Sequence, residues 1–168
     1  YATSYIPTYG SAVTRNQDDI TTTFSSAIPT TGNVSYLIHL DGSDRSGNAT
    51  GTHAAIQFQG NDYITYNATG GGYHRIRVNV NGNSNYYSGN IQKSQEAKIL
   101  AVINGDYIKI FMNGQQVNQG TLSDTPDMLS ATNYSGNTND NLGPLPINQI
   151  MLFPTALTDQ EAIDLTTI

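Results

Sequence analysis

The sequence predicts an all-β, antiparallel fold of the sandwich or barrel type, ending in one short C-terminal helix. Only 12% of the 168 residues are charged, and the polar remainder is rich in Asn, Thr, Ser and Gly. These residues favour turns and strands over helix interiors. From Ile20 onward, short runs of β-branched and aromatic residues are separated by turn signals about every ten residues, a spacing typical of sandwiches and barrels.

The candidate strands follow from these runs. In segment 73–80, Ile76 and Val78 alternate with Arg75 and Arg77, so one face is predicted to cover a core and the other to face water. Parallel pairing is not expected, because no internal segment has the helical period that a crossover connection needs. We place strands at residues 20–25, 34–40, 53–59, 62–67, 73–80, 85–88, 97–104, 106–112, 115–119 and 147–153.

Two Asn-Gly pairs predict tight hairpins. Asn104-Gly105 joins segment 97–104 to 106–112, and Asn113-Gly114 joins the latter to 115–119. Both central residues of a type I′ turn need a positive φ, which Asn and Gly tolerate. The Gly- and Asn-rich segments 69–72 and 133–141 are predicted to be exposed loops.

The two ends of the chain differ in character. At the C-terminus, Thr158 and Glu161 stand at the spacing of a helix capping box, with Leu157 and Ala162 placed for a hydrophobic staple. Residues 1–18 are predicted to form an extended entry segment, linker or first strand, ahead of one domain over 19–168. Because the chain starts at Tyr1 without a signal segment, we expect it to be part of a longer protein.

Two linked motifs near the C-terminus resemble the closing half of laminin-G-like, concanavalin-like jelly-roll domains. The first, DYIKIFMNGQQV, holds the Asn113-Gly114 turn; the second, INQIMLFPTALTDQEAIDL, is an apolar strand followed by a helix start at Thr158, Asp159 and Glu161. The opening ATSYIPTYGSAVTR is similar to a segment between modules of phage tail-fibre, other virion and bacterial surface proteins. These resemblances imply an antiparallel two-sheet jelly-roll sandwich at an extracellular or virion surface.

Charge and composition exclude several function classes. The net charge is −6, and the seven Lys and Arg form no cluster, so nucleic acid is not an expected partner. Apolar runs such as 99–103 are far shorter than the roughly 20 residues that span a bilayer, so no membrane insertion is expected. Without Cys, the chain has neither disulfides nor thiolate sites.

The acidic and basic residues do not suggest a catalytic site. A jelly-roll glycosidase needs two carboxylates about 5–9 Å apart, and the two Glu, Glu96 and Glu161, fall in a turn and a helix cap. A lyase could use the residue types of Tyr73, His74 and Arg75. Consecutive strand residues point to opposite faces, however, so this run is divided between two surfaces. We therefore predict a protein that is not an enzyme.

The residues that could bind a metal ion are the histidines and the carboxylates of one acidic loop. His39 and His53 lack a partner at zinc-ligand spacing and are expected to be ordinary strand residues. No cofactor is predicted apart from calcium, which prefers oxygen ligands and is carried at a loop rim by related domains. Asp41 and Asp44 are its candidate ligands, although Asp-Gly-Ser-Asp is also an ordinary turn sequence.

The candidate ligand site lies in the Tyr-rich middle of the chain. Glycans stack on aromatic rings and accept hydrogen bonds from polar neighbours, and with no Trp present Tyr must supply the ring. Arg75 and Arg77 make this surface the expected place for an acidic ligand. An ordinary Tyr-rich sheet surface or a subunit contact stays open as the alternative. The predicted site comprises Tyr73, Arg75, Arg77, Asn83, Asn85, Tyr86 and Tyr87.

These observations favour a non-enzymatic binding or structural module of a virion or cell-surface appendage, of the phage tail-fibre kind, that recognises a surface glycan or receptor or contributes to fibre assembly. Its partners would be a surface glycan or neighbouring subunits, with self-association left open. One alternative is a carbohydrate-binding module of a secreted bacterial enzyme. A weaker alternative is a polysaccharide lyase or hydrolase.

Overall fold

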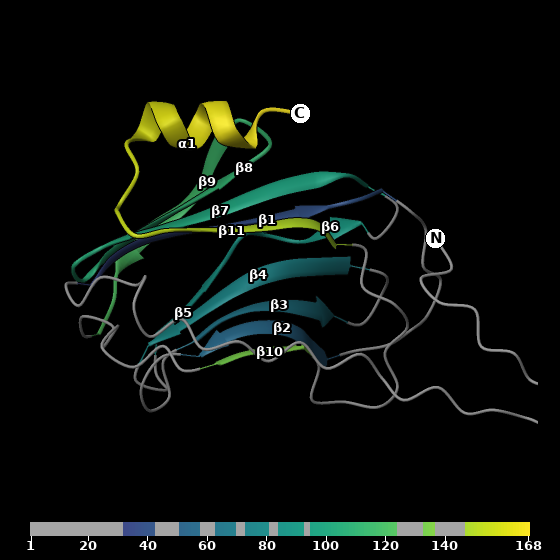
Figure 1. Cartoon of the computed structure of the whole chain (residues 1–168), viewed down its shortest axis with the longest axis horizontal. Helices are drawn as coiled ribbons and strands as arrows, with labels where there is room; N and C mark the ends of the chain where they lie inside the picture. Colours follow the sequence, from purple (N-terminus) through teal and green to yellow (C-terminus); the bar gives the residue numbers. More distant parts are fainter. Residues whose placement is uncertain are drawn as a thin grey trace, which may run out of the picture.

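The computed structural model describes residues 32–42, 51–57, 63–69, 73–80, 84–92, 95–123, 133–136 and 147–168. This part of the chain consists of antiparallel strands and one helix (Figure 1). Their bounds are β1 Asn33–Leu40, β2 Gly51–Gln57, β3 Tyr63–Thr69, β4 Tyr73–Val80, β5 Ser84–Tyr87, β6 Ile91–Gln92, β7 Ala97–Asn104, β8 Tyr107–Met112, β9 Gln115–Thr121, β10 Asn133–Gly136, β11 Ile147–Phe153 and α1 Asp159–Thr166.

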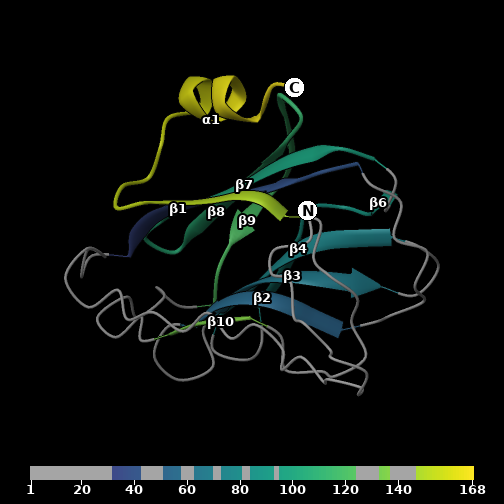
Figure 2. The ribbon, with the colours of Figure 1, turned by 45° about the vertical axis from the view of Figure 1, so that its right-hand side comes forward.

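The strands form two stacked sheets. Sheet A has the order β11-β1-β7-β8-β9, and sheet B has the order β10-β2-β3-β4-β5, with β6 also paired to β4. All pairings are antiparallel. Helix α1 lies on the side of sheet A that faces away from sheet B, which gives three layers (Figures 1 and 2). The predicted all-β sandwich with a C-terminal helix is confirmed.

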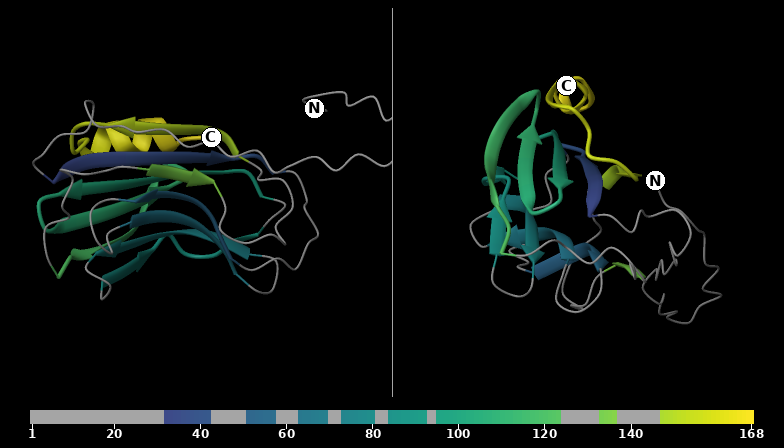
Figure 3. Two further views of the ribbon diagram at one scale, coloured as in Figure 1. Left: turned by 60° about the horizontal axis from the view of Figure 1, so that its bottom comes forward. Right: turned by 90° about the vertical axis from the view of Figure 1, so that its left-hand side faces the viewer.

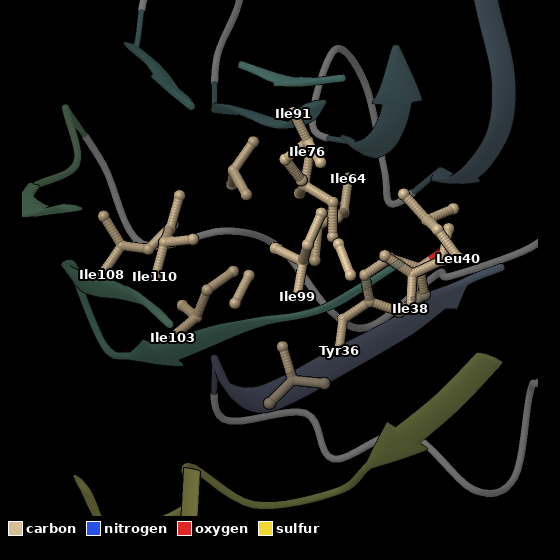
Figure 4. Close-up of a cluster of buried hydrophobic side chains, with 14 of the residues drawn as sticks. Tyr36, Ile38, Leu40, Ile64, Ile76, Ile91, Ile99, Ile103, Ile108 and Ile110 are labelled. Atoms are coloured by element: carbon tan, nitrogen blue, oxygen red, sulfur yellow. The ribbon is translucent and has the colours of Figure 1, made fainter. Parts of the chain in front are cut away.

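The main core lies between the two sheets. Sheet A contributes residues such as Tyr36 and Ile99, and sheet B contributes Ile64, Ile76 and Val78, all with at most 1% of their surface exposed. Figure 4 shows Tyr36 and Ile99 of sheet A meeting Ile64 and Ile76 of sheet B. Each aliphatic side chain buried in this way contributes about 1.5–3 kcal/mol. Hydrophobic burial is therefore what holds the sheets together.

A second apolar cluster lies between sheet A and α1. Four side chains project from the outer side of sheet A and form a cluster with Ala162 of the helix: Leu37, Leu100, Val102 and Phe111. Sheet A is thus covered on both faces, as the end-on panel of Figure 3 shows. This explains the unbroken apolar run at residues 99–103, because a strand buried on both faces has no polar face to alternate with.

The two predicted hairpins are present, and one differs in its turn. At Asn113-Gly114 both residues have positive φ, 49° and 77°, as a type I′ turn requires. At the other hairpin, Asn104 pairs with Tyr107, so the loop is Gly105 and Asp106 and only Gly105 has a positive φ, 63°. The type I′ turn predicted at Asn104-Gly105 is wrong by one residue; glycine at the first loop position is the type II′ pattern.

Helix α1 begins with the predicted capping box. The Glu161 backbone N–H donates to Thr158 Oγ1 at 3.3 Å, and the Thr158 N–H donates to Glu161 Oε2 at 2.8 Å. Lys109 Nζ lies 2.7 Å from Asp159 Oδ1 and ties the first turn to β8. In the preceding connection, the Leu157 N–H donates to the buried Ser35 hydroxyl at 3.0 Å. The entry to the helix is therefore fixed by polar contacts as well as by packing.

The capping box predicts a pH dependence of stability. Hydrogen bonds from the Thr158 backbone and hydroxyl lower the pKa of Glu161 below its ordinary value of 4.5. A carboxyl whose pKa is lowered by folding stabilises the protein above its unfolded pKa, and this contribution is lost as the pH falls through the folded value. Glu161→Gln, which can still accept from the cap, should lower the free energy of unfolding at pH 7 and should lower it less at pH 3. Urea titrations at both pH values would measure this.

Asp164→Asn is the matched control, because Asp164 lies in the same helix but outside the capping box and hydrogen-bonds Gln160. A Glu161→Gln variant that loses equal stability at both pH values would show that the carboxylate charge is not what the cap uses.

Some elements differ from the sequence predictions. Residues 133–136 form β10, which pairs with β2 at the edge of sheet B, so the loop predicted over 133–141 is wrong there. Strand β6 was not predicted, because two residues are too few to show a period. The predicted strand at 20–25 and the entry segment 1–18 lie outside the described residues.

Candidate functional site

The candidate site is the face of sheet B that points away from sheet A. Along β4, the buried core residues Ile76 and Val78 alternate with half-buried Tyr73, Arg75 and Arg77. This alternation confirms the predicted division of the strand into a core face and a polar face. On the next strand, Tyr87 of β5 pairs with Arg77 and lies on the same face. We call these four residues, Tyr73, Arg75, Arg77 and Tyr87, the arginine face.

The guanidinium group of Arg75 stacks on the ring of Tyr87. Its central carbon lies 3.8 Å from the ring centroid. Because Arg77 is the direct partner of Tyr87, Arg75 is its diagonal neighbour, which is within reach of a long side chain. Such a cation–π contact contributes about 0.5–1 kcal/mol when exposed and more when water is excluded. The stack holds the planar group in one orientation.

The Nε atom of Arg75 is buried and makes no hydrogen bond to any residue that the structure describes. Burying a donor without an acceptor costs about 1–3 kcal/mol, and more for a charged group. The arginine fork fits carboxylate and other planar oxyanions with two parallel bonds. Because Nε has no exposed surface, a ligand oxygen reaches it only after the atoms that cover it move.

Ser88 fixes the end of β5 beside this stack. The Ser88 N–H donates to the Ile76 carbonyl at 3.0 Å, and the Ile76 N–H donates back to the Ser88 hydroxyl at 3.0 Å. The side chain thus replaces a backbone acceptor where β4 changes its partner from β5 to β6. Ser88 is itself buried, with 1% of its surface exposed. This position was not among the predicted site residues, since a lone Ser in a polar run carries no distinguishing signal.

The strand register places five of the seven predicted ligand residues on one face of sheet B, namely the four of the arginine face and Asn85. Asn85 pairs with Asn79, on the arginine-face side of β4. Tyr86 instead pairs with Val78, a core position, so the backbone places it on the opposite side from Tyr87. Asn83 lies outside the described residues. Asn79, on the same side of β4 as the two arginines, is only 1% exposed, so the polar face of this strand is buried at its end.

Charges are distributed unevenly between the two sheets. None of the strands of sheet B contains Asp or Glu. Two of these strands, β3 and β5, flank β4 with its two arginines. Lys98 and Lys109 belong to sheet A, where Lys98 donates to the Thr167 carbonyl at 2.8 Å and Lys109 pairs with Asp159. In the described part of the chain, the acidic residues lie next to the strands of sheet A or in α1: Asp41, Glu96, Asp106, Asp159, Glu161 and Asp164.

The two glutamates do not form a catalytic pair. Glu96 Oε1 lies 2.8 Å from His39 Nε2, at the start of β7, whereas Glu161 is engaged in the helix cap. His39 is therefore a partnered strand residue, as predicted, with a partner 57 positions away in sequence.

No calcium site can be built from the described residues. Asp41 follows β1 and is half-buried, while Asp44 lies outside the described part. Within the described segments, no three His, Asp or Glu side chains gather closely enough to hold a metal ion. Calcium binding at Asp41 and Asp44 stays a prediction.

Among the residues that the structure describes, no helix is long and apolar enough to cross a membrane.

Comparison with solved structures identifies the fold. The chain is similar to the CBM40 module of a Ruminococcus gnavus IT-sialidase bound to α2,3-sialyllactose, with a TM-score of 0.54, 16% identity, and 80% of this chain and 82% of that one covered. It is also similar to domain 4 of an extracellular arabinanase from Geobacillus stearothermophilus in complex with arabinotriose, with a TM-score of 0.58, 14% identity, and 83% and 68% covered.

A third similar structure is the mouse laminin α1 chain, domains LG4-5, with a TM-score of 0.55, 13% identity, and 84% of this chain and 40% of that one covered. No family model and no curated protein sequence matches the chain. The laminin-G-like, concanavalin-like jelly-roll fold inferred from the sequence is confirmed. At these identities the likeness shows the fold alone, so function must be argued from the site.

Proposed function

We propose that this chain is a non-enzymatic glycan-binding module and that its arginine face binds an acidic glycan. The observation that carries the proposal is Arg75, held by the Tyr87 ring with its Nε atom buried and unpaired among the described residues. The guanidinium of Arg75 offers a ligand oxyanion a planar, charged group held in place by stacking, and the second arginine of β4 adds a favourable charge beside it.

Similar structures add support from their bound sugars. The R. gnavus module holds sialyllactose, a glycan that carries a carboxylate, and the arabinanase domain holds a neutral arabinotriose. The fold therefore accommodates both kinds of sugar, and the side chains of each site select between them. On the arginine face, two cations on strands without a carboxylate favour the acidic kind.

For the parent protein, we propose an extracellular virion or cell-surface appendage, in which the module attaches the particle or cell to a surface glycan. This proposal depends on the opening segment ATSYIPTYGSAVTR. A carbohydrate-binding module of a secreted enzyme is the second candidate, favoured by the sialidase and arabinanase origin of the similar structures.

The binding proposal is tested by calorimetric titration of the whole chain with paired probes: α2,3-sialyllactose against lactose, and a uronate or sulfated oligosaccharide against its neutral counterpart. We expect binding of at least one acidic probe, weaker at higher salt because the attraction between charges is screened, and little binding of the neutral partner. Equal affinity within every pair would contradict the acidic preference. Binding to none of the glycans would refute the proposed function.

A further inference from the structure

The two sheets are joined by a hydrogen bond at the end of β5. Asn118 lies on β9, an edge strand of sheet A, and its Nδ2 donates to the carbonyl oxygen of Tyr87 at 2.9 Å. The two residues are 31 positions apart, and β5 and β9 lie in contact. An edge strand of one sheet thus holds an edge strand of the other.

The carbonyl of Tyr87 is available to Asn118 because of the pairing of β5 with β4. Ser88 and Ile76 exchange the hydrogen bonds of the ladder, which makes the adjacent pair, Tyr87 and Arg77, a non-hydrogen-bonded pair. The main-chain groups of Tyr87 therefore point away from β4, toward the open edge of sheet B. Asn118 occupies the place that a further strand would take.

The orientation of the Asn118 amide is fixed by its two contacts. While Nδ2 donates to Tyr87, Oδ1 accepts the backbone N–H of Gln119 at 2.8 Å. A reversed amide would bring an oxygen against the Tyr87 carbonyl and an NH₂ group against a donor. The hydrogen bond within β9 therefore orients the Asn118 amide so that its NH₂ group faces β5.

We infer that Asn118 is a positioning residue of the arginine face, an inference that rests on the proposed function. It holds the main chain at Tyr87, the ring of Tyr87 holds the guanidinium of Arg75, and this guanidinium is the group that the proposed function assigns to the ligand. A group held in its bound orientation before the ligand arrives loses less freedom on binding. Sheet A, which contributes no residue to the arginine face, thereby acts on ligand affinity.

Asn118→Asp isolates this contact. The carboxylate keeps an acceptor for the Gln119 N–H but loses the donor to Tyr87 and places an oxygen against its carbonyl. Since the substitution also adds a negative charge, Gln119→Glu is the matched control. It adds the same charge one residue away and keeps the acceptor that Gln119 offers to Gln116 Nε2 at 2.8 Å.

The first measurement needs no ligand. In the wild type, the Tyr87 ring should shift the NMR signals of the Arg75 δ protons upfield. Asn118→Asp should move these signals toward values typical of an unstacked arginine, with the melting temperature showing that the domain stays folded. Gln119→Glu should leave them in place. An unchanged Arg75 signal in the folded Asn118→Asp variant would overturn the inference.

The second measurement is the affinity for the acidic probe that binds the wild type, with α2,3-sialyllactose tried first. Asn118→Asp should weaken binding about threefold to tenfold, the effect of one hydrogen bond, and Gln119→Glu should weaken it less. Equal weakening in both variants would assign the effect to charge and overturn the inference. If no glycan binds the wild type while the Arg75 signal still depends on Asn118, the proposed function fails and the positioning contact stands.

Discussion

Replacing Arg75 with Gln is expected to reduce the affinity for an acidic glycan at least tenfold. The substitution removes the charge and the guanidinium donors that stacking on Tyr87 holds in place. A hydrogen bond to a charged group contributes about 1.5–3 kcal/mol, and 1.4 kcal/mol corresponds to a factor of ten in Kd. Calorimetric titration with the acidic probe that binds the wild type would measure the loss.

Two further variants separate the shape of the guanidinium from its charge. Arg75→Lys keeps the charge but has neither Nε nor the planar group that stacks on Tyr87, so it should recover only part of the affinity. Lys109→Gln lowers the net charge by the same amount on sheet A and should leave affinity nearly unchanged. If Lys109→Gln weakens binding as much as Arg75→Gln, the attraction is a property of the total charge and the arginine face is not the site.

Phe111→Ala is expected to cost about 3–5 kcal/mol of the free energy of unfolding, the range for truncating a large buried aromatic side chain. Phe111 is 1% exposed and belongs to the cluster between sheet A and α1. Its loss leaves a cavity under the helix, so α1 should lose protection from amide exchange ahead of the strands. Urea unfolding and hydrogen exchange would measure the two effects.

Tyr107→Ala is the control on the same strand, because Tyr107 is an aromatic residue that is 36% exposed. We expect its cost to be within about 0.5 kcal/mol, as for most surface substitutions. Similar losses from both substitutions would mean that the cluster under α1 does not contribute as a packed core.

Sequence patterns with a local physical cause predicted the fold well. The alternation of Ile76 and Val78 with Arg75 and Arg77 identified both faces of β4, because side-chain direction follows from strand geometry alone. The capping box at Thr158 succeeded for the same reason. Even the shifted turn at Gly105 was wrong only in its loop register, since glycine at a positive φ was required in either case.

Contacts between distant segments could not be predicted in this way. The core-side position of Tyr86 depends on the register between β4 and β5, and a one-residue change of register exchanges the faces of a strand. The link from Asn118 to Tyr87 depends on how two sheets stack, and the pair of His39 with Glu96 joins positions that local pattern does not relate. The arginine face was thus predicted in its residue types, while its positioning contacts required the structure.

The three-layer arrangement has a practical consequence for displaying the domain. Helix α1 and the exposed residue Ile168 lie on one side of sheet A, and the arginine face lies on the outer side of sheet B. A tag fused after Ile168 would therefore anchor the domain to a sensor chip, bead or nanoparticle with its arginine face directed toward the solution. Immobilised in this orientation, many copies could engage a glycan-coated surface at once, and their combined avidity would make weak single-site binding measurable.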